Sequence, residues 1–473
     1  MNNHSLKKNS ILNVIRQICA VIFPFITFPY ATRILGTGNY GKVAFGQSVI
    51  SYMSLISCLG VIEYAVREGA KAKKDKTEFQ KLSNQIFSIN IISTIVAYLL
   101  LFTLMLIYPG FKGYITLLLV QSLCMIFTTL GTDWINMAYE DYLYIALRYI
   151  FCHIISLVLL FIIVRTSEDY VLYAFTCVLT DILANIANII YIRKKYKIFT
   201  RFTFDIGGTR HLIPILILFG STLASFVYIN SDVIMLGILK NEDTVGIYSA
   251  AAKIYIAIKQ VLNAALMVTI PRIAGNISIG KDNRDLLKKI RTASILILLP
   301  ACAGLYTISN EIIILICGDA YSDAGLILKI LSVALFFASS GCYYISVVLI
   351  PYGKEKNVLI GTVIAAVVNI ILNLILIPRY GGIAAAMTTV LSELIMTATG
   401  LLSTRGITDP KLIKPYIIST INIIFIFNVS SIIKRSVGII WIRLIIIVLL
   451  SVIFVAAVCT ISFYKDIRKQ SMN

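Results

Sequence analysis

Charged side chains are scarce in this sequence, and no long polar segment interrupts it. Only 14% of the 473 residues are Asp, Glu, Lys or Arg, whereas 58% are hydrophobic and the mean hydropathy is +0.88. A soluble globular chain carries roughly 25% charged residues. The composition therefore excludes an ordinary soluble protein and predicts an all-α chain that crosses a membrane many times.

Motifs for catalysis and metal binding are also missing. The sequence contains no HExxH, no CxxC, no complete GxxxxGK[ST] loop and no nucleophile elbow, and its three histidines are scattered. All nine cysteines lie in apolar runs, which favours packing over disulfides or metal ligation. We therefore expect no enzyme activity, no metal and no cofactor. An ion gradient, the membrane potential or a cargo gradient would have to supply any energy.

Fourteen apolar runs are long enough to cross a bilayer, which takes about 20 residues in a helix. Because the count is even, both termini lie on the same side. The longest connectors, near 193–210 and 272–291, are too short to form folded domains. The predicted spans are 10–32, 43–63, 83–108, 113–135, 143–164, 169–192, 211–239, 245–270, 291–317, 325–350, 357–378, 382–403, 411–433 and 438–463.

Basic residues between the spans indicate the orientation, because cytoplasmic loops are enriched in Lys and Arg. With the N-terminus inside, 29 of the 42 Lys and Arg residues fall on the cytoplasmic face, ten on the opposite face and three inside spans. This distribution predicts that both termini are cytoplasmic. The net charge of +19 is then a feature of topology, and we expect no nucleic-acid partner.

A weak internal repeat divides the predicted helices into two halves. The LG-turn-YG pattern of residues 35–41 recurs in residues 236–248, and residues 169–186 resemble residues 380–397. Parallel repeats of this kind flank a central cavity in many transporters, although apolar helices can also resemble each other by chance. We expect a lobe of six helices in 1–210, a second in 211–404, and two extra helices with a cytoplasmic tail in 405–473.

Prolines and glycines concentrate between the first two predicted spans, in FPFITFPYATRILGTGNYGKVAFG (23–46). Proline bends a helix, and a glycine-rich turn joins two helices that move. We expect this stretch to form the hinges of an outer gate, with an arginine at its rim. The candidate gate residues are Pro24, Pro29, Arg33, Gly36 and Gly41.

Cations inside the predicted spans need an explanation, because each costs roughly 2.5–3.5 kcal/mol on insertion scales. Arg16 lies early in span one, and Lys253 and Lys259 lie in span eight. Arg16 is close enough to the cytoplasmic interface for its side chain to reach water. Three cations in a cavity favour an anionic cargo, since phosphate or pyrophosphate gains charge-assisted hydrogen bonds there.

Three carboxylates in the spans are candidates for ion coupling or ion pairing: Asp181, Asp232 and Glu393. Asp232 lies near Lys253 if spans seven and eight are antiparallel neighbours. Polar stripes accompany these charges, among them Gln47, Ser51, Ser54 and Cys58 on one face of span two, and could line one shared cavity. The alternative is that such small polar residues simply hold helices together.

Four stretches resemble a known family. They are FPYATRILGTGNYGKVAFGQSVISYMSLISCLGVIEYAVRE (28–68), SDVIMLGILKNEDTVGIYSAAAKI (231–254), the Pro271–Arg272 pair and IPRYGGIAAAMTTVLSE (377–393). They resemble the Wzx-type flippases for O-antigen and related polysaccharide repeat units. These belong to the polysaccharide-transport branch of the multidrug/oligosaccharidyl-lipid/polysaccharide (MOP) exporter superfamily.

The resemblance implies a protein of lipopolysaccharide or capsule biosynthesis in the bacterial inner membrane. It would move undecaprenyl-pyrophosphate-linked oligosaccharide from the cytoplasmic to the periplasmic leaflet by alternating access. Membrane lipid, a polysaccharide polymerase and a chain-length regulator are the expected partners. The resemblance matches Arg16, Lys253, Lys259 and Asp232 to the charged lumen residues that engage pyrophosphate or couple to ions.

Two other functions stay open. One is a cation-coupled multidrug or small-molecule antiporter of the same superfamily, for which a more acidic, aromatic-lined cavity is expected. The other is a membrane polysaccharide polymerase or ligase, for which a sizeable external loop is expected.

Overall fold

The computed structural model describes residues 3–207, 209–408 and 412–471. Side chains are described for residues 23–207 and 210–460, apart from 221, 224, 225, 228, 229, 409–411 and 459. Within these residues every regular element is a helix, and one isolated β-bridge joins Arg405 to Thr408. The prediction of an all-α chain is confirmed.

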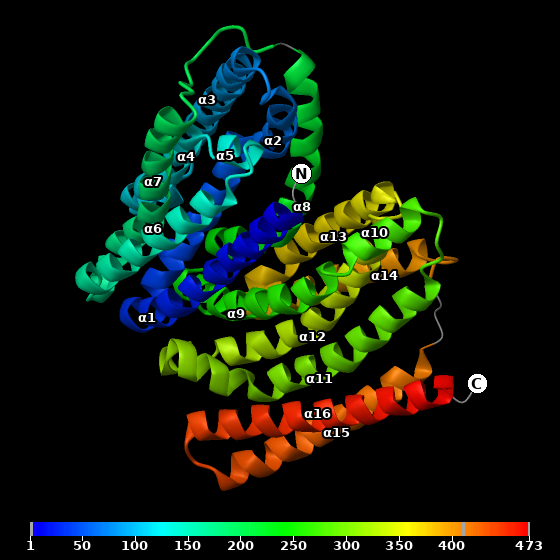
Figure 1. The fold of residues 1–473 in the computed structure, drawn as a ribbon. Coiled ribbons are helices and arrows are strands. Elements are labelled where there is room, and N and C mark those ends of the chain that lie inside the picture. Colours follow the sequence, from blue (N-terminus) through cyan, green and yellow to red (C-terminus); the bar gives the residue numbers. More distant parts are fainter. Residues whose placement is uncertain (1–2, 208, 409–411, 472–473) are drawn as a thin grey trace. The chain divides into compact units, whose positions relative to one another are not determined.

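Two compact units make up the chain, residues 1–246 and 247–473. The first contains α1 (Asn3–Cys58), α2 (Val61–Ala72), α3 (Lys76–Ile107), η1 (Pro109–Tyr114), α4 (Ile115–Gly131), α5 (Trp134–Ala138), α6 (Tyr142–Ile163), η2 (Ser167–Asp169), α7 (Tyr170–Lys195), α8 (Thr209–Leu239) and the start of α9 (Glu242–Met267) (Figure 1). The second contains the rest of α9, then α10 (Ile270–Ser278), α11 (Arg284–Cys317), η3 (Asp319–Tyr321), α12 (Ala324–Cys342), η4 (Tyr343–Leu349), α13 (Glu355–Tyr380), α14 (Gly382–Ser403), α15 (Ile413–Ser436) and α16 (Ile440–Ser471).

Twelve helical segments of the described residues are long and apolar enough to span a bilayer, which makes this a multi-pass membrane protein. The segment at 23–72 is one of the twelve, and α8 adds two shorter apolar stretches at 210–220 and 230–239. These are the places where the sequence predicts two further spans. The count of fourteen stays a prediction.

The first helix changes direction at Gly36. Its 56 residues would measure about 84 Å if straight, far beyond the ~30 Å hydrocarbon core of a bilayer. Gly36 has φ 71° and ψ −178°, whereas both Pro24 and Pro29 keep helical dihedral angles. The rings of Phe28 and Tyr40 lie 5.8 Å apart, although residues twelve apart along a straight helix are separated by about 18 Å. The turn between the first two spans is therefore made by Gly36.

In the first unit, α1 packs against α3, α4 and α6, and α4 packs against α7. At one end, α2, α3 and α5 enclose an apolar cluster around Phe79, Trp134 and Ile135. Ile198, beyond the end of α7, and Ile215 of α8 belong to the same cluster. Because α8 also contacts α1 and α2, it lies in the first unit, and the lobe boundary at residue 210 stays a prediction.

In the second unit, α12 is packed between α11 and α14, and α13 lies along α14. The start of α14 presents Gly382 and the buried alanines 384–386, and such small residues let membrane helices approach closely. The C-terminal pair, α15 and α16, packs on α11 (Figure 1). The two extra helices of the prediction are thus attached to this unit through α11.

Candidate functional site

Two glycines in the first unit bring the two LG-containing turns into contact. A Cβ atom on Gly41 would overlap the backbone carbonyl of Glu242, and one on Gly246 would overlap that of Thr37. Side chains cannot occupy these positions, so only glycine allows the start of α9 to pack this closely on α1. Gly246 has the place in the second turn that Gly41 has in the first.

Polar contacts surround these glycines. The Thr37 hydroxyl donates to a carboxylate oxygen of Asp243, and the Tyr114 hydroxyl donates to Glu242 at 3.0 Å. Arg33 is exposed one turn before Gly36. The described contact is therefore close-packed at its glycines and polar around them, and its place on the external face stays a prediction.

A cavity of about 450 Å³ with several polar side chains in its wall lies within the first unit, between α1, α4, α7 and α8. Asp181 of α7 lines it with an exposed side chain, and no described side chain donates a hydrogen bond to its carboxylate. Gln47, Ser51 and Ser54 of α1 face the same space. The predicted polar stripe of span two and the predicted carboxylate of span six therefore meet in one cavity.

The amide of Gln121 forms part of the wall. Its nitrogen donates to the Val43 carbonyl at 3.1 Å, while its oxygen is buried without a hydrogen-bond partner among the described residues. This oxygen lies against Gly46, so Asp181 is the charged group that lines the cavity among the described residues. A carboxylate among hydroxyl and amide side chains suits a proton or a small hydrated cation more than an anion. No group of three or more His, Cys, Asp or Glu suited to a metal occurs among the described residues.

In the second unit, Lys259 of α9 forms an ion pair with Glu393 of α14. The Lys259 ammonium lies 2.6 Å from a Glu393 carboxylate oxygen, and the Tyr255 hydroxyl donates to the same oxygen at 3.2 Å. The Lys259 side chain is 24% exposed and the Glu393 side chain 8%. A predicted cargo-binding cation and a predicted carboxylate thus neutralise each other in this state.

The other predicted charges lie in different parts of the chain. Asp232 is buried in α8 of the first unit, and Lys253 is half-buried in α9 of the second. Their pairing stays a prediction. Arg16 lies outside the residues whose side chains are described.

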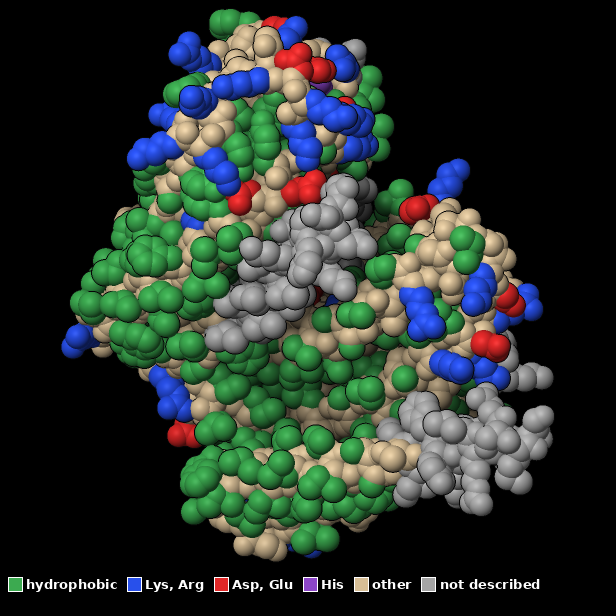
Figure 2. Space-filling model, viewed as in Figure 1, with side chains coloured by type: hydrophobic (Ala, Val, Ile, Leu, Met, Phe, Trp, Pro, Cys, Tyr) green, Lys and Arg blue, Asp and Glu red, His purple; other side chains and the backbone are tan. Residues whose placement is uncertain are grey.

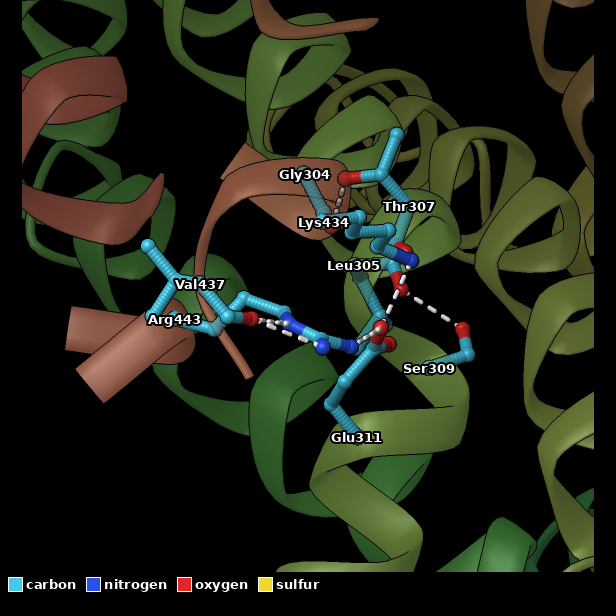
Figure 3. Close-up of polar contacts among 8 residues, drawn as sticks. All are labelled: Gly304, Leu305, Thr307, Ser309, Glu311, Lys434, Val437 and Arg443. Atoms are coloured by element: carbon cyan, nitrogen blue, oxygen red, sulfur yellow. Dashed lines mark hydrogen bonds and ion pairs between the residues drawn. The ribbon is translucent and has the colours of Figure 1, made fainter. Parts of the chain in front are cut away.

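A second charge cluster in the second unit joins α15 and α16 to α11 (Figure 3). Glu311 accepts from Lys434 at 2.9 Å and from Arg443 at 3.5 Å on the same oxygen, and its other oxygen is buried without a hydrogen-bond partner among the described residues. Lys434 also donates to the Thr307 carbonyl, and Arg443 donates to the Val437 carbonyl. The α15–α16 turn is thereby attached to α11 through two cations and one carboxylate.

Sequence reasoning missed Glu311 as a candidate. The signal was present, because Glu311 is a carboxylate within the apolar run ISNEIIILIC, as isolated as Asp181 is in its own run. Its partners give no such signal, because Lys434 lies in the short polar break at 434–438 and Arg443 lies near the start of the last predicted span. A buried carboxylate requires a cation from a neighbouring helix, and loop lysines at a span end can supply one.

Comparison with known proteins gives matches over most of the chain. A family model described as "Polysaccharide biosynthesis protein" matches residues 6–276. The "Putative O-antigen transporter" of Escherichia coli (strain K12) is 24% identical over 409 residues, which cover 86% of this chain and 98% of that protein. The "Probable low-salt glycan biosynthesis flippase Agl15" of Haloferax volcanii is 28% identical over 187 residues, 37% of this chain and 38% of that protein.

Two solved structures share the fold. "Lipid II flippase MurJ, inward closed conformation" superposes with a TM-score of 0.78 at 17% identity, covering 97% of this chain and 99% of that one. An inward-facing multidrug resistance MATE family transporter of the MOP superfamily superposes with a TM-score of 0.62 at 15% identity, covering 83% of this chain and 97% of that one. At such identities the likeness concerns the fold alone.

Proposed function

This chain belongs to the polysaccharide biosynthesis protein family, and from that premise we propose that it is a flippase for lipid-linked oligosaccharides. The observation that carries the proposal is the family match over more than half of the chain. Relatives named as an O-antigen transporter and a glycan biosynthesis flippase support it, as does the fold shared with a lipid flippase. The expected resemblance to the polysaccharide-transport flippases is confirmed by the family match and the O-antigen transporter relative, and the fold is shared with a transporter of the MOP superfamily. The relatives' names describe transport and not catalysis, in agreement with the expectation that the chain is no enzyme.

The cargo we propose is undecaprenyl-pyrophosphate-linked oligosaccharide, moved from the cytoplasmic to the periplasmic leaflet of the bacterial inner membrane. Both termini are then cytoplasmic, and a polymerase and a chain-length regulator act on the delivered units. The cations proposed to engage the pyrophosphate are Arg16, Lys253 and Lys259. Charge-assisted hydrogen bonds to an anion are strongest where water is excluded.

The Lys259–Glu393 pair supports a specific cargo-binding step. At a separation of 2.6 Å the lysine charge is already compensated, so an anionic cargo has to compete with Glu393 for it. Protonation of Glu393, or its pairing with a coupling cation, releases Lys259 to the pyrophosphate. Return of Glu393 to Lys259 then displaces the cargo. One carboxylate thereby links binding and release to an ion.

The cavity at Asp181 supports ion coupling in the first unit. Its exposed carboxylate suits a proton or small cation that enters from one side and leaves on the other. A further candidate for ion coupling is Asp232, which is buried in α8 four residues before the second LG turn. The proposed energy source is an ion gradient.

The contact between the two LG turns supports alternating access. In the proposed cycle, Gly41 and Gly246 pack together when the outer side is closed and separate when it opens. Gly36 allows this change because a glycine, which has no Cβ atom, adopts a positive φ without strain. Pro24, Pro29 and Arg33 belong to the moving segment of α1.

A reconstituted system tests the proposal. Proteoliposomes contain the purified protein and a lipid-linked oligosaccharide with a fluorescent sugar label, and dithionite reduces only labels in the outer leaflet. We expect reduction of both leaflets with the wild-type protein and with Lys281→Gln, an exposed control, and slow inner-leaflet reduction with Lys259→Met. Reduction limited to the outer leaflet for every variant contradicts the proposal. Efflux of cationic dyes by the same vesicles would instead favour the multidrug antiporter.

A further inference from the structure

Residues 193–207, called the connector here, are the last three residues of α7 and the segment that joins it to α8, and they combine basic and aromatic side chains on their exposed surface. Its sequence is RKKYKIFTRFTFDIG, and Figure 2 shows Lys and Arg side chains gathered with hydrophobic ones at the end of the first unit where α7 ends. The exposed fractions of Phe199, Phe202 and Phe204 are 49%, 45% and 93%. Three exposed phenylalanines in one short connector are not explained by packing within the chain.

The connector is held in place by α3. Three α3 side chains spaced four residues apart bind every second residue of its backbone. Gln80 exchanges two hydrogen bonds with Phe199, Asn84 accepts from the Arg201 nitrogen at 3.0 Å, and Ser88 accepts from the Thr203 nitrogen at 2.8 Å. An extended segment is thereby laid along one face of a helix.

Both ends of the connector are also anchored. Ile198 is buried in the apolar cluster of α2, α3 and α5, and Ile206 packs against the same cluster. The ring of Tyr196 stacks on Tyr139 with 4.2 Å between centroids, and its hydroxyl donates to Asp141 at 2.8 Å. The middle of the connector consequently points its phenylalanines outward in a fixed arrangement.

Asp141 stabilises the first anchor electrostatically. Burial raises the pKa of this carboxyl, but hydrogen bonds from Lys195, Tyr191 and Tyr196 outweigh burial and hold the pKa below its usual value. The carboxylate is therefore charged at neutral pH and keeps the root of the connector in position.

The level of the connector relative to the membrane follows from α3. The apolar part of α3 begins near Ile86, and its 22 residues to Ile107 measure about 33 Å, close to the thickness of the hydrocarbon core. Gln80 lies about 9 Å outside this part and Ser88 at its border. Since Phe199 is bound at Gln80 and Thr203 at Ser88, the connector descends toward the membrane and holds Phe204 at its surface.

The basic side chains of the connector are exposed, as its phenylalanines are. Arg193, Lys194, Lys197 and Arg201 are exposed, and the described part of the chain offers them no carboxylate partner, whereas Lys195 is paired with Asp141. Four unpaired cations beside exposed aromatic rings at the membrane border match an anionic lipid surface in charge and polarity.

We propose that residues 193–207 form a binding surface for anionic phospholipid headgroups of the membrane that contains the protein. Phe202 and Phe204 insert among the upper acyl chains while the four cations bind the headgroup phosphates. The hydrogen bonds to α3 order the segment before lipid arrives, so little conformational entropy is lost on binding. This surface is separate from the cargo pathway and does not depend on which cargo is moved.

The fluorescence of a tryptophan at position 204 tests whether the connector contacts lipid. The variant Phe204→Trp is made in a Trp441→Phe background, in which Trp134 is the other tryptophan and is only 4% exposed. The protein is reconstituted in bilayers of phosphatidylcholine and phosphatidylglycerol, and the bromine quencher is carried on the acyl chains of one lipid or the other. Each basic residue near such a surface changes lipid partitioning on the order of fivefold. We therefore expect brominated phosphatidylglycerol to quench position 204 at least about twofold more than brominated phosphatidylcholine.

A matched pair of charge variants completes the test. Replacing Arg193, Lys194, Lys197 and Arg201 by Gln removes the preference for phosphatidylglycerol, and the same change at Lys281, Arg284, Lys288 and Lys289 of the other basic connector leaves it intact. Added inorganic phosphate leaves the quenching unchanged, because the ligand is a lipid. Equal quenching by both lipids overturns the proposal. So does emission of a water-exposed tryptophan that iodide quenches and bromolipids do not, which would indicate a surface facing solvent or another protein.

Discussion

The ion pair between Lys259 and Glu393 makes a quantitative prediction. Lys259→Met removes the cation and leaves the Glu393 carboxylate, 8% exposed, with one hydrogen bond from Tyr255. Removing one partner of a buried ion pair costs about 3–5 kcal/mol. Because the lysine side chain is 24% exposed and the tyrosine bond remains, we expect the lower end of that range, about 3 kcal/mol.

The reverse change is expected to cost less. Glu393→Gln leaves Lys259 without its partner, but a side chain that is one-quarter exposed keeps part of its hydration, so we expect about 2 kcal/mol. The double variant removes both charges and leaves neither unpaired. The double variant should lose about 2 kcal/mol less unfolding free energy than the two single variants lose together, which is within the range measured for residues in direct contact.

A double-mutant cycle measures this coupling. The free energy of unfolding of the four proteins is determined by denaturant titration in mixed micelles, with Lys281→Met as an exposed lysine control. Additive losses would refute the direct interaction. Flipping is measured in parallel, and Glu393→Gln is expected to bind anionic cargo more tightly and release it more slowly. If Glu393→Gln flips cargo at the wild-type rate, Glu393 has no part in release.

Four further predictions concern the other sites. Gly246→Ala is expected to slow transport at least tenfold with little loss of folded protein, because its Cβ prevents closure against Thr37; Gly275→Ala, whose Cβ meets nothing within 4 Å, is the control. Asp181→Asn should abolish the dependence of flipping on the ion gradient, and unchanged gradient dependence would exclude the cavity as a coupling site. Glu311→Gln should destabilise the protein by about 3 kcal/mol and expose the α15–α16 turn to protease, whereas an unchanged melting midpoint would show that apolar packing alone holds this pair. Because the pKa of Asp141 is lowered, its stabilisation of the connector is complete above the usual aspartate range and is lost as pH falls through the lowered pKa. Backbone hydrogen exchange in residues 196–205, corrected for intrinsic rates, should therefore speed up below about pH 4 in the wild type. In Asp141→Asn it should not depend on pH. A wild type whose exchange is equally independent of pH would contradict the prediction.

Much of the fold could be predicted because lipid imposes a simple rule on sequence. Each span needs a continuous apolar run, and the runs in α3, α6 and α13 are visible without any knowledge of packing. The turn in α1 was predicted in the right stretch, but the sequence does not reveal that Gly36 alone makes it. Proline and glycine both signal a break, and only the backbone geometry distinguishes a tolerated proline from the residue at which the chain turns.

The candidate site was less predictable because it depends on which helices are neighbours. Lys259 and Glu393 were each recognised as costly charges, yet 134 residues separate them, and periodicity carries no information on the contact between α9 and α14. The same reason explains why Glu311 was missed. By contrast, the spacing of Gln47, Ser51 and Ser54 predicts one polar helix face, and that face does line the cavity at Asp181.

The central claim is that this protein carries a lipid-linked oligosaccharide across its membrane. The most direct measurement is made in its native cells, from which the gene is deleted and any redundant flippase is removed. Labelled lectin or periodate added to spheroplasts then reports the fraction of lipid-linked repeat units in the outer leaflet. The account predicts that these units accumulate facing the cytoplasm and reach the outer leaflet again when the wild-type gene is restored. Normal delivery to the outer leaflet in the deleted strain would contradict it.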